Sequence, residues 1–303
     1  MTIQPPLPGE PRRPLGPRDP GDAWVIAPSG ERYWGRFGAA GLLAVDARRG
    51  VLLQHRVSWS HFGGTWALPG GARHEGESAT DGAIREATEE AGVPERAVRP
   101  RLLSVLDLGY WSYTTLVADV VRPFEAVISD PESVELSWVP IGEVDTYPLH
   151  PGFADSWTVL RGLLEARPVI VVDAANVVGS VPDGWWRDRA GATERLRGRI
   201  AALAETGVPA PALGLGEQHW FPAFVLVVEG KARDVLAVDG PELVQTVAAP
   251  ASGDDEIVAR VVSLAAAGRL VTVVTSDRAL VARCEAAGAT VHGAGWLLDL
   301  LEE

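Results

Sequence analysis

Three glutamates in the first half of the chain have the types and spacing for metal chemistry. Glu86, Glu89 and Glu90 stand at i, i+3 and i+4, so a helix would carry their side chains on one face. Such carboxylates repel one another unless a cation lies among them. Hard oxygen ligands favour Mg²⁺, with Mn²⁺ as the alternative, and these ions take substrate phosphate oxygens into the rest of their shell. The alternative to a metal site is a solvated acidic helix face.

The segment around these glutamates has the signals of a helix preceded by a tight turn. The pattern predicts a helix over residues 78–91 that begins near Glu77 or Ser78 and ends at Gly92. Gly70 and Gly71 let the backbone turn tightly before it. Arg85 lies one residue before Glu86 and four before Glu89, so it is placed to neutralise or orient a carboxylate.

The order of residue types resembles the Nudix box, G-x5-E-x7-R-E-U-x-E-E-x-G-U, in which U is a bulky aliphatic residue. The matching residues are Gly71, Glu77, Arg85, Glu86, Glu89, Glu90, Gly92 and Val93, and Ala87 fills one U position with a small side chain. The resemblance covers roughly residues 22 to 160. It implies an α/β/α sandwich with a mixed sheet that hydrolyses a phosphoanhydride bond in a nucleoside diphosphate linked to another group. It also implies Glu86, Glu89 and Glu90 as metal ligands, with Glu77 and Arg85 in support.

Six residues are candidates for substrate binding: Arg56, Trp66, Gly70, Gly71, Tyr110 and Glu135. The stretch from Trp66 to Gly71, with Arg56 upstream, is similar to MutT-like pyrophosphatases and favours a nucleoside triphosphate-type substrate. Tyr110 lies where Nudix enzymes acting on dinucleoside polyphosphates tend to carry a tyrosine. Glu135 is a candidate to complete the metal site, or a surface carboxylate on a strand. The alternatives are therefore a dinucleoside polyphosphate or nucleotide-sugar hydrolase, and a nucleotide-sensing regulatory protein with a non-catalytic C-terminal domain.

Acidic residues in the second half recur where predicted strands end and predicted helices begin. Asp173 follows the apolar run Val169 to Val172, Asp277 follows a run that starts at Leu270, and Asp254 with Asp255 opens a helical segment. The carboxyl ends of parallel strands meet at one edge of a sheet. We therefore expect these acids to converge, with helix capping as the alternative for Asp254 and Asp277.

The D-x-x-N spacing from Asp173 to Asn176 and the pair Ser276–Asp277 resemble the NYN branch of PIN-like domains. The resemblance implies an RNase-type centre with Asp173, Asp254 or Asp255, and Asp277 as metal ligands. Asn176 and Ser276 would support this site, and single-stranded RNA would be its partner. No basic stripe with interleaved aromatic residues accompanies these motifs, so nuclease activity is expected to be weak or to need a partner.

The elements predict an α/β protein with three segments. Residues 1–21 are proline-rich and read as a disordered tail, residues 22–166 as the Nudix domain, and residues 167–303 as the NYN/PIN-like domain with a mainly parallel sheet. The second segment alternates strand and helix, which predicts a Rossmann-like α/β/α sandwich.

Composition sets the outer limits of this interpretation. A chain of 303 residues that is 47% hydrophobic and 22% charged has the composition of a folded protein of about two domains. Its apolar stretches are too short for a membrane span, and it carries no apolar signal core, so we expect a cytoplasmic protein. A net charge of −13 argues against a surface that coats duplex DNA. Cys284, the single cysteine, is expected to be buried, and the oligomeric state stays open, a homodimer included.

Overall fold

The computed structural model describes residues 19–182, 185–230 and 244–302. The chain divides into two compact units, Met1–Leu164 and Glu165–Glu303, and each is described by itself. The predicted proline-rich tail lies outside the described residues over positions 1–18. Among the helices that the described ranges form, none combines the length and apolar content needed to cross a membrane.

Unit 1 is built on a mixed sheet. The strands of unit 1, of which β1 and β2 pair with each other outside this sheet, are β1 (Trp24–Ile26), β2 (Arg32–Trp34), β3 (Ala39–Asp46), β4 (Gly50–Arg56), β5 (Trp66–Ala67), β6 (Gly70–Ala72), β7 (Val98–Asp107), β8 (Ser112–Val120) and β9 (Ser133–Val139). Its helices are α1 (Ala79–Ala91) and α2 (Pro151–Leu163), with a 3-10 turn η1 (Val144–Thr146). Strands β7, β8, β3, β4 and β5 lie in that order, with β6 beside β3 and β9 beside β4. The β3–β8 pairing is parallel and the others are antiparallel.

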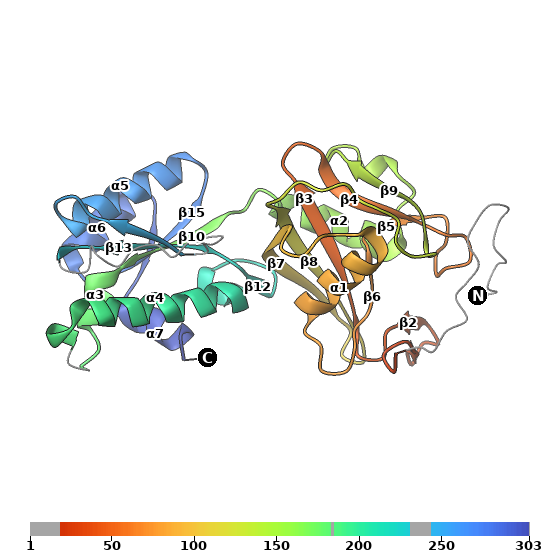
Figure 1. The fold of residues 1–303 in the computed structure, drawn as a ribbon, viewed down its shortest axis with the longest axis horizontal. Coiled ribbons are helices and arrows are strands. Elements are labelled where there is room, and N and C mark those ends of the chain that lie inside the picture. Colours follow the sequence, from red (N-terminus) through yellow and green to blue (C-terminus); the bar gives the residue numbers. More distant parts are fainter. Residues whose placement is uncertain (1–18, 183–184, 231–243, 303) are drawn as a thin grey trace. The chain divides into compact units, whose positions relative to one another are not determined.

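The alternation of side chains along β3 explains how unit 1 forms its layers. Leu42 and Ala44 pack with Ala83 and Ala87 of α1 in one core cluster, whereas Leu43 points to the other face of the sheet and is equally buried. Helix α2 lies on the side of the sheet opposite α1 (Figure 1). Its Trp157 is buried. The small alanines of α1 let the helix approach the sheet closely, which positions the glutamates on its remaining faces.

Unit 2 has a five-stranded parallel sheet. The strands of unit 2, of which β11 and β12 lie outside this sheet, are β10 (Pro168–Asp173), β11 (Val208–Pro209), β12 (His219–Trp220), β13 (Ala223–Val228), β14 (Val244–Ala248), β15 (Leu270–Val274) and β16 (Thr290–His292). Its helices are α3 (Ala174–Gly179), α4 (Arg189–Thr206), α5 (Gly253–Ala266), α6 (Arg278–Ala286) and α7 (Ala294–Leu300), with 3-10 turns η2 (Trp185–Arg187) and η3 (Ala210–Leu213). The parallel sheet has the order β14-β13-β10-β15-β16, while β11 and β12 form an antiparallel pair.

The run Val169 to Val172 is buried on both faces of this sheet, as a parallel sheet between two helical layers requires. Ile170 and Val172 join the core formed with α3, α4 and α7. Val169 and Val171 join the core formed with α5 and α6, which also buries Cys284. Figure 1 shows these two groups of helices on opposite faces. The predicted α/β class, with one mixed and one parallel sheet, and the burial of the cysteine are therefore confirmed.

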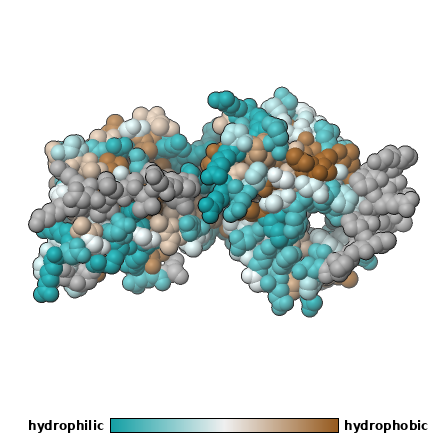
Figure 2. Space-filling view, in the orientation of Figure 1, coloured by the Kyte–Doolittle hydropathy of each residue, from teal (hydrophilic) through white to brown (hydrophobic). Residues whose placement is uncertain are grey.

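A local signal sets the start of helix α4, because Asp188 caps it by accepting the Gly191 N–H at 2.9 Å. The short hairpin of β1 and β2 was not predicted. On the face drawn in Figure 2, each unit exposes hydrophilic and hydrophobic residues side by side.

Candidate active site

Helix α1 carries the glutamates, and its ends are fixed by local signals. The Ser78 hydroxyl accepts the Asp81 N–H at 3.0 Å and caps the start of the helix. Gly92 ends it in the left-handed conformation, with φ of 64°, and donates its N–H to the carbonyls of Ala87 and Thr88. Glu86, Glu89 and Glu90 therefore lie in the last two turns of α1.

Arg85 holds the loop before α1 against the helix. Its Nε and Nη2 donate to the two carboxylate oxygens of Glu77 at 2.8 and 3.0 Å, and Nη2 also donates to the Ala72 carbonyl at 2.9 Å. Its Nη1 donates to Glu86 at 2.9 Å and to Glu89 at 3.3 Å. Glu77 in turn accepts the His74 N–H at 2.9 Å. Through these bonds, one guanidinium couples the loop to two glutamates of the helix.

Glu86 packs against the backbone of Gly71. A Cβ at Gly71 would lie 2.7 Å from Glu86 Oε2, so a side chain at this position would require the Glu86 carboxylate to move. Burial raises the pKa of Glu86 to about 7, with Arg85 opposing this rise and Glu89 adding to it. A largely buried carboxylate with a raised pKa is a group whose charge a nearby cation would stabilise.

Glu90 is buried and Glu89 is exposed. Glu90 Oε2 accepts the Gly70 N–H at 2.8 Å. Burial and then Glu86 raise the pKa of Glu90 well above its ordinary value, while Arg56 lowers it. The side chain of Glu89 is 57% exposed. Glu86 and Glu90 thus face Gly70 and Gly71, and Glu89 reaches the same region from the solvent side. The two glycines lie in strand β6 and pair with β3, so the tight turn expected there from the sequence is wrong.

The donor set fits a hard divalent cation by its chemistry, since buried carboxylates with raised pKa values gain most from such an ion. Gly71 provides the space beside Glu86 that a Cβ would fill. Within the described ranges, no three His, Cys, Asp or Glu side chains already stand at metal-ligand spacing. Arg85 occupies part of the carboxylate surface of Glu86 and Glu89 in this arrangement.

Arg56 and three further residues surround Glu90, and the sequence identified only Arg56. The carboxylates of Asp130 and Glu132 raise the pKa of Glu90, and Arg56 lowers it. Asp130 itself is half-buried, and burial raises its pKa to about 6. Tyr113 lies on β8. Burial is the largest cause that raises its pKa, and the charges of Glu90 and Glu86 raise it further. In the part of the chain that the structure describes, Arg56 Nε is buried without a hydrogen-bond partner.

The predicted Glu135 lies farther along β9, opposite His55 of β4. The structure brings Asp130 and Glu132, which lie just before β9, toward Glu90. The pairing of β4 with β9 shifts register between His55 and Arg56, and the Val57 N–H donates to the Glu132 carbonyl at 3.0 Å. The only sequence signal for these acids is an acidic turn before a strand.

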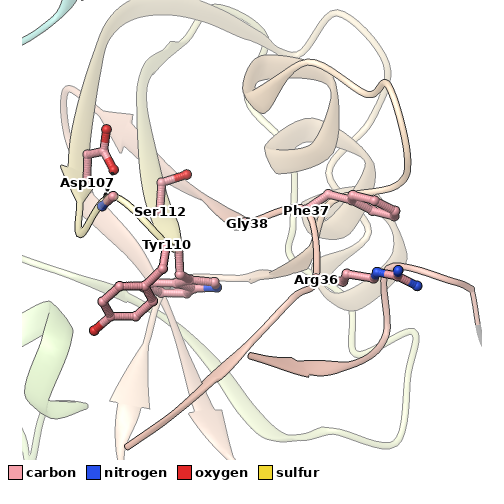
Figure 3. Close-up of a pocket in the computed structure, with 8 residues that line it drawn as sticks. Arg36, Phe37, Gly38, Asp107, Tyr110 and Ser112 are labelled. Carbon is pink, nitrogen blue, oxygen red and sulfur yellow. Dashed lines mark hydrogen bonds between the residues drawn. The ribbon is translucent and has the colours of Figure 1, made fainter. Parts of the chain in front are cut away.

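Trp66 and Tyr110, the two predicted aromatic contacts, lie in different surroundings. Trp66 is buried and stacks on His55, with ring centroids 4.9 Å apart. Tyr110 is exposed in the turn between β7 and β8, where it lines an open cavity of about 210 Å³ with Arg36, Phe37 and other residues (Figure 3). Trp66 therefore packs as part of the core, and Tyr110 belongs to this separate cavity.

In unit 2, Asp173 lies at the carboxyl end of β10 and is tied to the end of β15. Its Oδ1 accepts the Asn176 N–H at 3.1 Å, and its Oδ2 accepts the Thr275 hydroxyl at 2.9 Å. Asn176 Oδ1 accepts the Ser276 N–H at 2.8 Å, and Ser276 Oγ accepts the Ala294 N–H at 3.2 Å. These contacts bring the two halves of the predicted motif, about one hundred residues apart, to one edge of the sheet.

Further carboxylates surround Asp173 at this edge. Burial is the largest cause that raises the pKa of Asp173, and the charges of Asp254 and Glu229 raise it further. Burial also comes first for Asp254, and the charge of Asp277 follows. The sequence reasoning missed Glu229, although it directly follows strand β13. We call Asp173, Glu229, Asp254 and Asp277 the acidic edge.

Helix capping accounts for part of this cluster and excludes one alternative. Asp277 Oδ1 caps α6 by accepting the N–H groups of Ala279 and Leu280 at 2.8 and 3.0 Å. Asp254 is not a cap, because α5 starts at Gly253, whose N–H donates to Glu229 at 2.9 Å. Asp255 is 70% exposed and pairs with Arg283 at 2.6 Å. Of the two predicted alternatives, Asp254 faces the acidic edge and Asp255 does not.

Comparisons with known proteins match unit 1. The NUDIX domain model matches residues 35–163. The "Putative 8-oxo-dGTP diphosphatase 3" of Mycobacterium tuberculosis is 49% identical over an alignment of 154 residues that covers 48% of this chain and 70% of that protein. The "Nucleoside triphosphate pyrophosphatase/Nudix hydrolase fusion protein" of Bifidobacterium longum is 40% identical over 46% of this chain and 30% of that protein. A crystal structure of a Nudix hydrolase from M. smegmatis, RenU, is 47% identical over 47% of this chain and 94% of that one, with a TM-score of 0.44.

Proposed function

The chain belongs to the Nudix family, and we propose that it is a Mg²⁺-dependent pyrophosphohydrolase that favours nucleoside triphosphate-type substrates. The observation that carries this proposal is the arrangement of Glu86 and Glu90 around the backbone of Gly70 and Gly71. The family's activity is hydrolysis of phosphoanhydride bonds. A protein that only binds a nucleotide has no need for two buried carboxylates with raised pKa values beside the glycines of β6.

The described residues have distinct roles in this reaction. Glu86, Glu89 and Glu90 would hold the cation, which when bound draws charge from phosphate oxygens and acidifies water. One of these carboxylates, or a neighbour such as Asp130, takes up the proton of the attacking water. The Gly70 N–H holds Glu90 in place. The ion pair of Arg85 with Glu77 holds the loop against the helix, which fixes the positions of the reacting groups.

Arg56 supports a phosphate-bearing substrate. Its guanidinium lies close enough to Glu90 and Asp130 to lower the pKa of both, and its buried Nε donates no hydrogen bond within the described ranges. Arginine is well suited to bind phosphate oxygens, because its donors form a planar fork. We therefore assign Arg56 to the phosphate chain of the substrate.

The favoured substrate class rests on relatives and on the local sequence. Two of the similar proteins carry diphosphatase or triphosphate pyrophosphatase names. The alternatives are dinucleoside polyphosphates, nucleotide sugars, and nucleotide sensing without turnover. A panel of nucleoside triphosphates, oxidised dNTPs, dinucleoside polyphosphates and sugar nucleotides, each assayed with Mg²⁺, distinguishes these classes by the products released.

Glu90→Gln tests the assignment of the site. We expect it to abolish Mg²⁺-dependent release of pyrophosphate while the protein stays folded, because the amide oxygen can still accept the Gly70 N–H. Glu95→Gln is the matched control, since Glu95 is 90% exposed. Turnover at the parental rate in Glu90→Gln would refute the assignment.

A second function is proposed for unit 2, a metal-dependent RNase-type centre at the acidic edge. The convergence of Asp173, Asp254 and Asp277 on the ends of β10 and β15 supports it. We expect Asp173→Asn and Asp254→Asn to lose Mg²⁺-dependent cleavage of single-stranded RNA and Asp255→Asn to retain it. Equal cleavage by all three variants and the parent would end this proposal.

A further inference from the structure

A small cavity in unit 2 lies directly beside the acidic edge. Its volume is about 110 Å³, and its walls come from α3, η2, α4 and the end of β13. Ala174 and Ala175, which line it, immediately follow Asp173, and Glu229 belongs both to the cavity wall and to the acidic edge. Pockets that enclose drug-sized ligands measure about 300–1,000 Å³. This cavity therefore suits one planar ring system and not a whole nucleotide.

Trp185 and Arg189 give the cavity an aromatic wall with a cation against it. The Arg189 guanidinium lies over the Trp185 ring, 5.1 Å from the ring centroid. Trp185 packs on the core formed with α3 and α4, and its ring lies against the α3 backbone, since a Cβ at Gly179 would meet it at 3.8 Å. A tryptophan held in this way, with a guanidinium over its ring, is a stacking platform in which the arginine shares the contact with a base.

Polar groups on the wall favour a base with hydrogen-bond donors. Glu229 Oε2 accepts the Gly253 N–H at 2.9 Å, and in the described ranges Oε1 accepts no hydrogen bond. A carboxylate accepts from adjacent N–H groups and has no proton to donate. Among the four RNA bases, guanine presents two adjacent donors on its Watson–Crick edge, the ring N1–H and the exocyclic amine. Adenine and cytosine present the amine alone.

We infer that this cavity binds one base of a single-stranded RNA, with guanine preferred, stacked on Trp185 and bonded to Glu229. The inference rests on the proposed RNase function for the identity of the strand. It extends that function, because a base held next to Asp173 would select which phosphodiester bond lies at the acidic edge. Recognition of the base itself needs neither metal nor cleavage.

The test uses the full-length protein without metal and uncharged nucleosides as probes, so that phosphate repulsion by the acidic edge does not interfere. The readout is the Trp185 indole N–H resonance, identified as the signal lost in Trp185→Phe. We expect a saturable shift of this signal with affinity in the order guanosine, inosine, adenosine, because inosine lacks the exocyclic amine. Trp186→Phe is the matched control, since Trp186 is adjacent and 59% exposed but does not line the cavity.

Two variants separate recognition from folding. Glu229→Gln should weaken guanosine binding about tenfold, as expected for loss of charge-assisted hydrogen bonds, and should abolish the preference over adenosine. Arg189→Met leaves the hydrogen bond from the Gly253 N–H to Glu229 untouched and should weaken the binding of all nucleosides alike. No shift of the Trp185 signal at millimolar guanosine, or an equal affinity for guanosine and adenosine in the parent, would overturn the inference.

The RNase proposal fails separately from this one. If guanosine shifts the Trp185 signal while the parent cleaves no RNA with Mg²⁺, base binding stands and the nuclease function falls. If the parent cleaves RNA with no preference for the base and the Trp185 signal does not move, the cavity has no role in recognition.

Discussion

Replacing Gly71 by alanine tests whether a glycine at this position of strand β6 sets the position of Glu86. The new methyl group would lie 2.7 Å from Glu86 Oε2 and 2.8 Å from its Cδ. An ordinary contact requires at least about 3.4 Å, so the carboxylate must retreat by roughly 0.7 Å. Gly71 has an ordinary φ, so alanine brings no backbone strain and the change acts on the carboxylate. Misplacing a reacting group by about 1 Å costs on the order of 10²-fold in rate, which is about 2.7 kcal/mol of transition-state stabilisation.

We expect kcat/KM for Mg²⁺-dependent release of pyrophosphate to fall roughly 30- to 100-fold in Gly71→Ala, by the same relation. Gly142→Ala is the matched control, because a Cβ at Gly142 meets nothing within 4 Å. Combining Gly71→Ala with Glu86→Asp should lose less than the product of the two single effects, since the shorter side chain leaves room for the methyl group. A parental kcat/KM in Gly71→Ala, with unfolding unchanged, would refute this account of the site.

The remaining predictions concern stability and reactivity. Arg85→Ala should lower the free energy of unfolding in urea by about 2 to 4 kcal/mol, and Arg85→Lys should recover little of it, because one ammonium cannot replace the fork that holds Glu77, Glu86 and the Ala72 carbonyl. Burial, with Arg56 nearby, lowers the pKa of His150 from 6.5 to about 4. Because the folded state favours the neutral imidazole, its contribution to the free energy of unfolding is fully present above pH 6.5 and should fall by up to about 3 kcal/mol as the pH drops to 4. His150→Asn keeps an acceptor for the Gly152 N–H and should remove this dependence in pH-stepped urea titrations. Gly92→Ala should cost about 1 kcal/mol in the same assay, because φ at this cap is 64°. The buried Cys284, whose pKa burial raises, should react with a thiol reagent only upon unfolding, and rapid labelling of the native protein would contradict its burial.

The features that the sequence determined are those in which the partners are close along the chain. Glu86, Glu89 and Glu90 share a helix because helical periodicity relates residues up to four apart. Ser78 and Gly92 bound that helix because their side chain and backbone suit its two ends. The buried parallel strand at Val169 to Val172 was predictable as well, since only a strand covered on both faces is apolar throughout.

Which distant groups meet these residues depends on the tertiary fold. Strand pairing brings Tyr113 to Glu90, a neighbour that no local pattern in the sequence indicates. The register shift where β4 meets β9 brings Asp130 and Glu132 there, although Glu135 was expected. In unit 2, the order of the parallel strands brings Glu229 and Thr275 to Asp173. The physical reason is that a strand's neighbours depend on sheet order and register, which are set by the packing of the whole core and leave no local signal in the sequence.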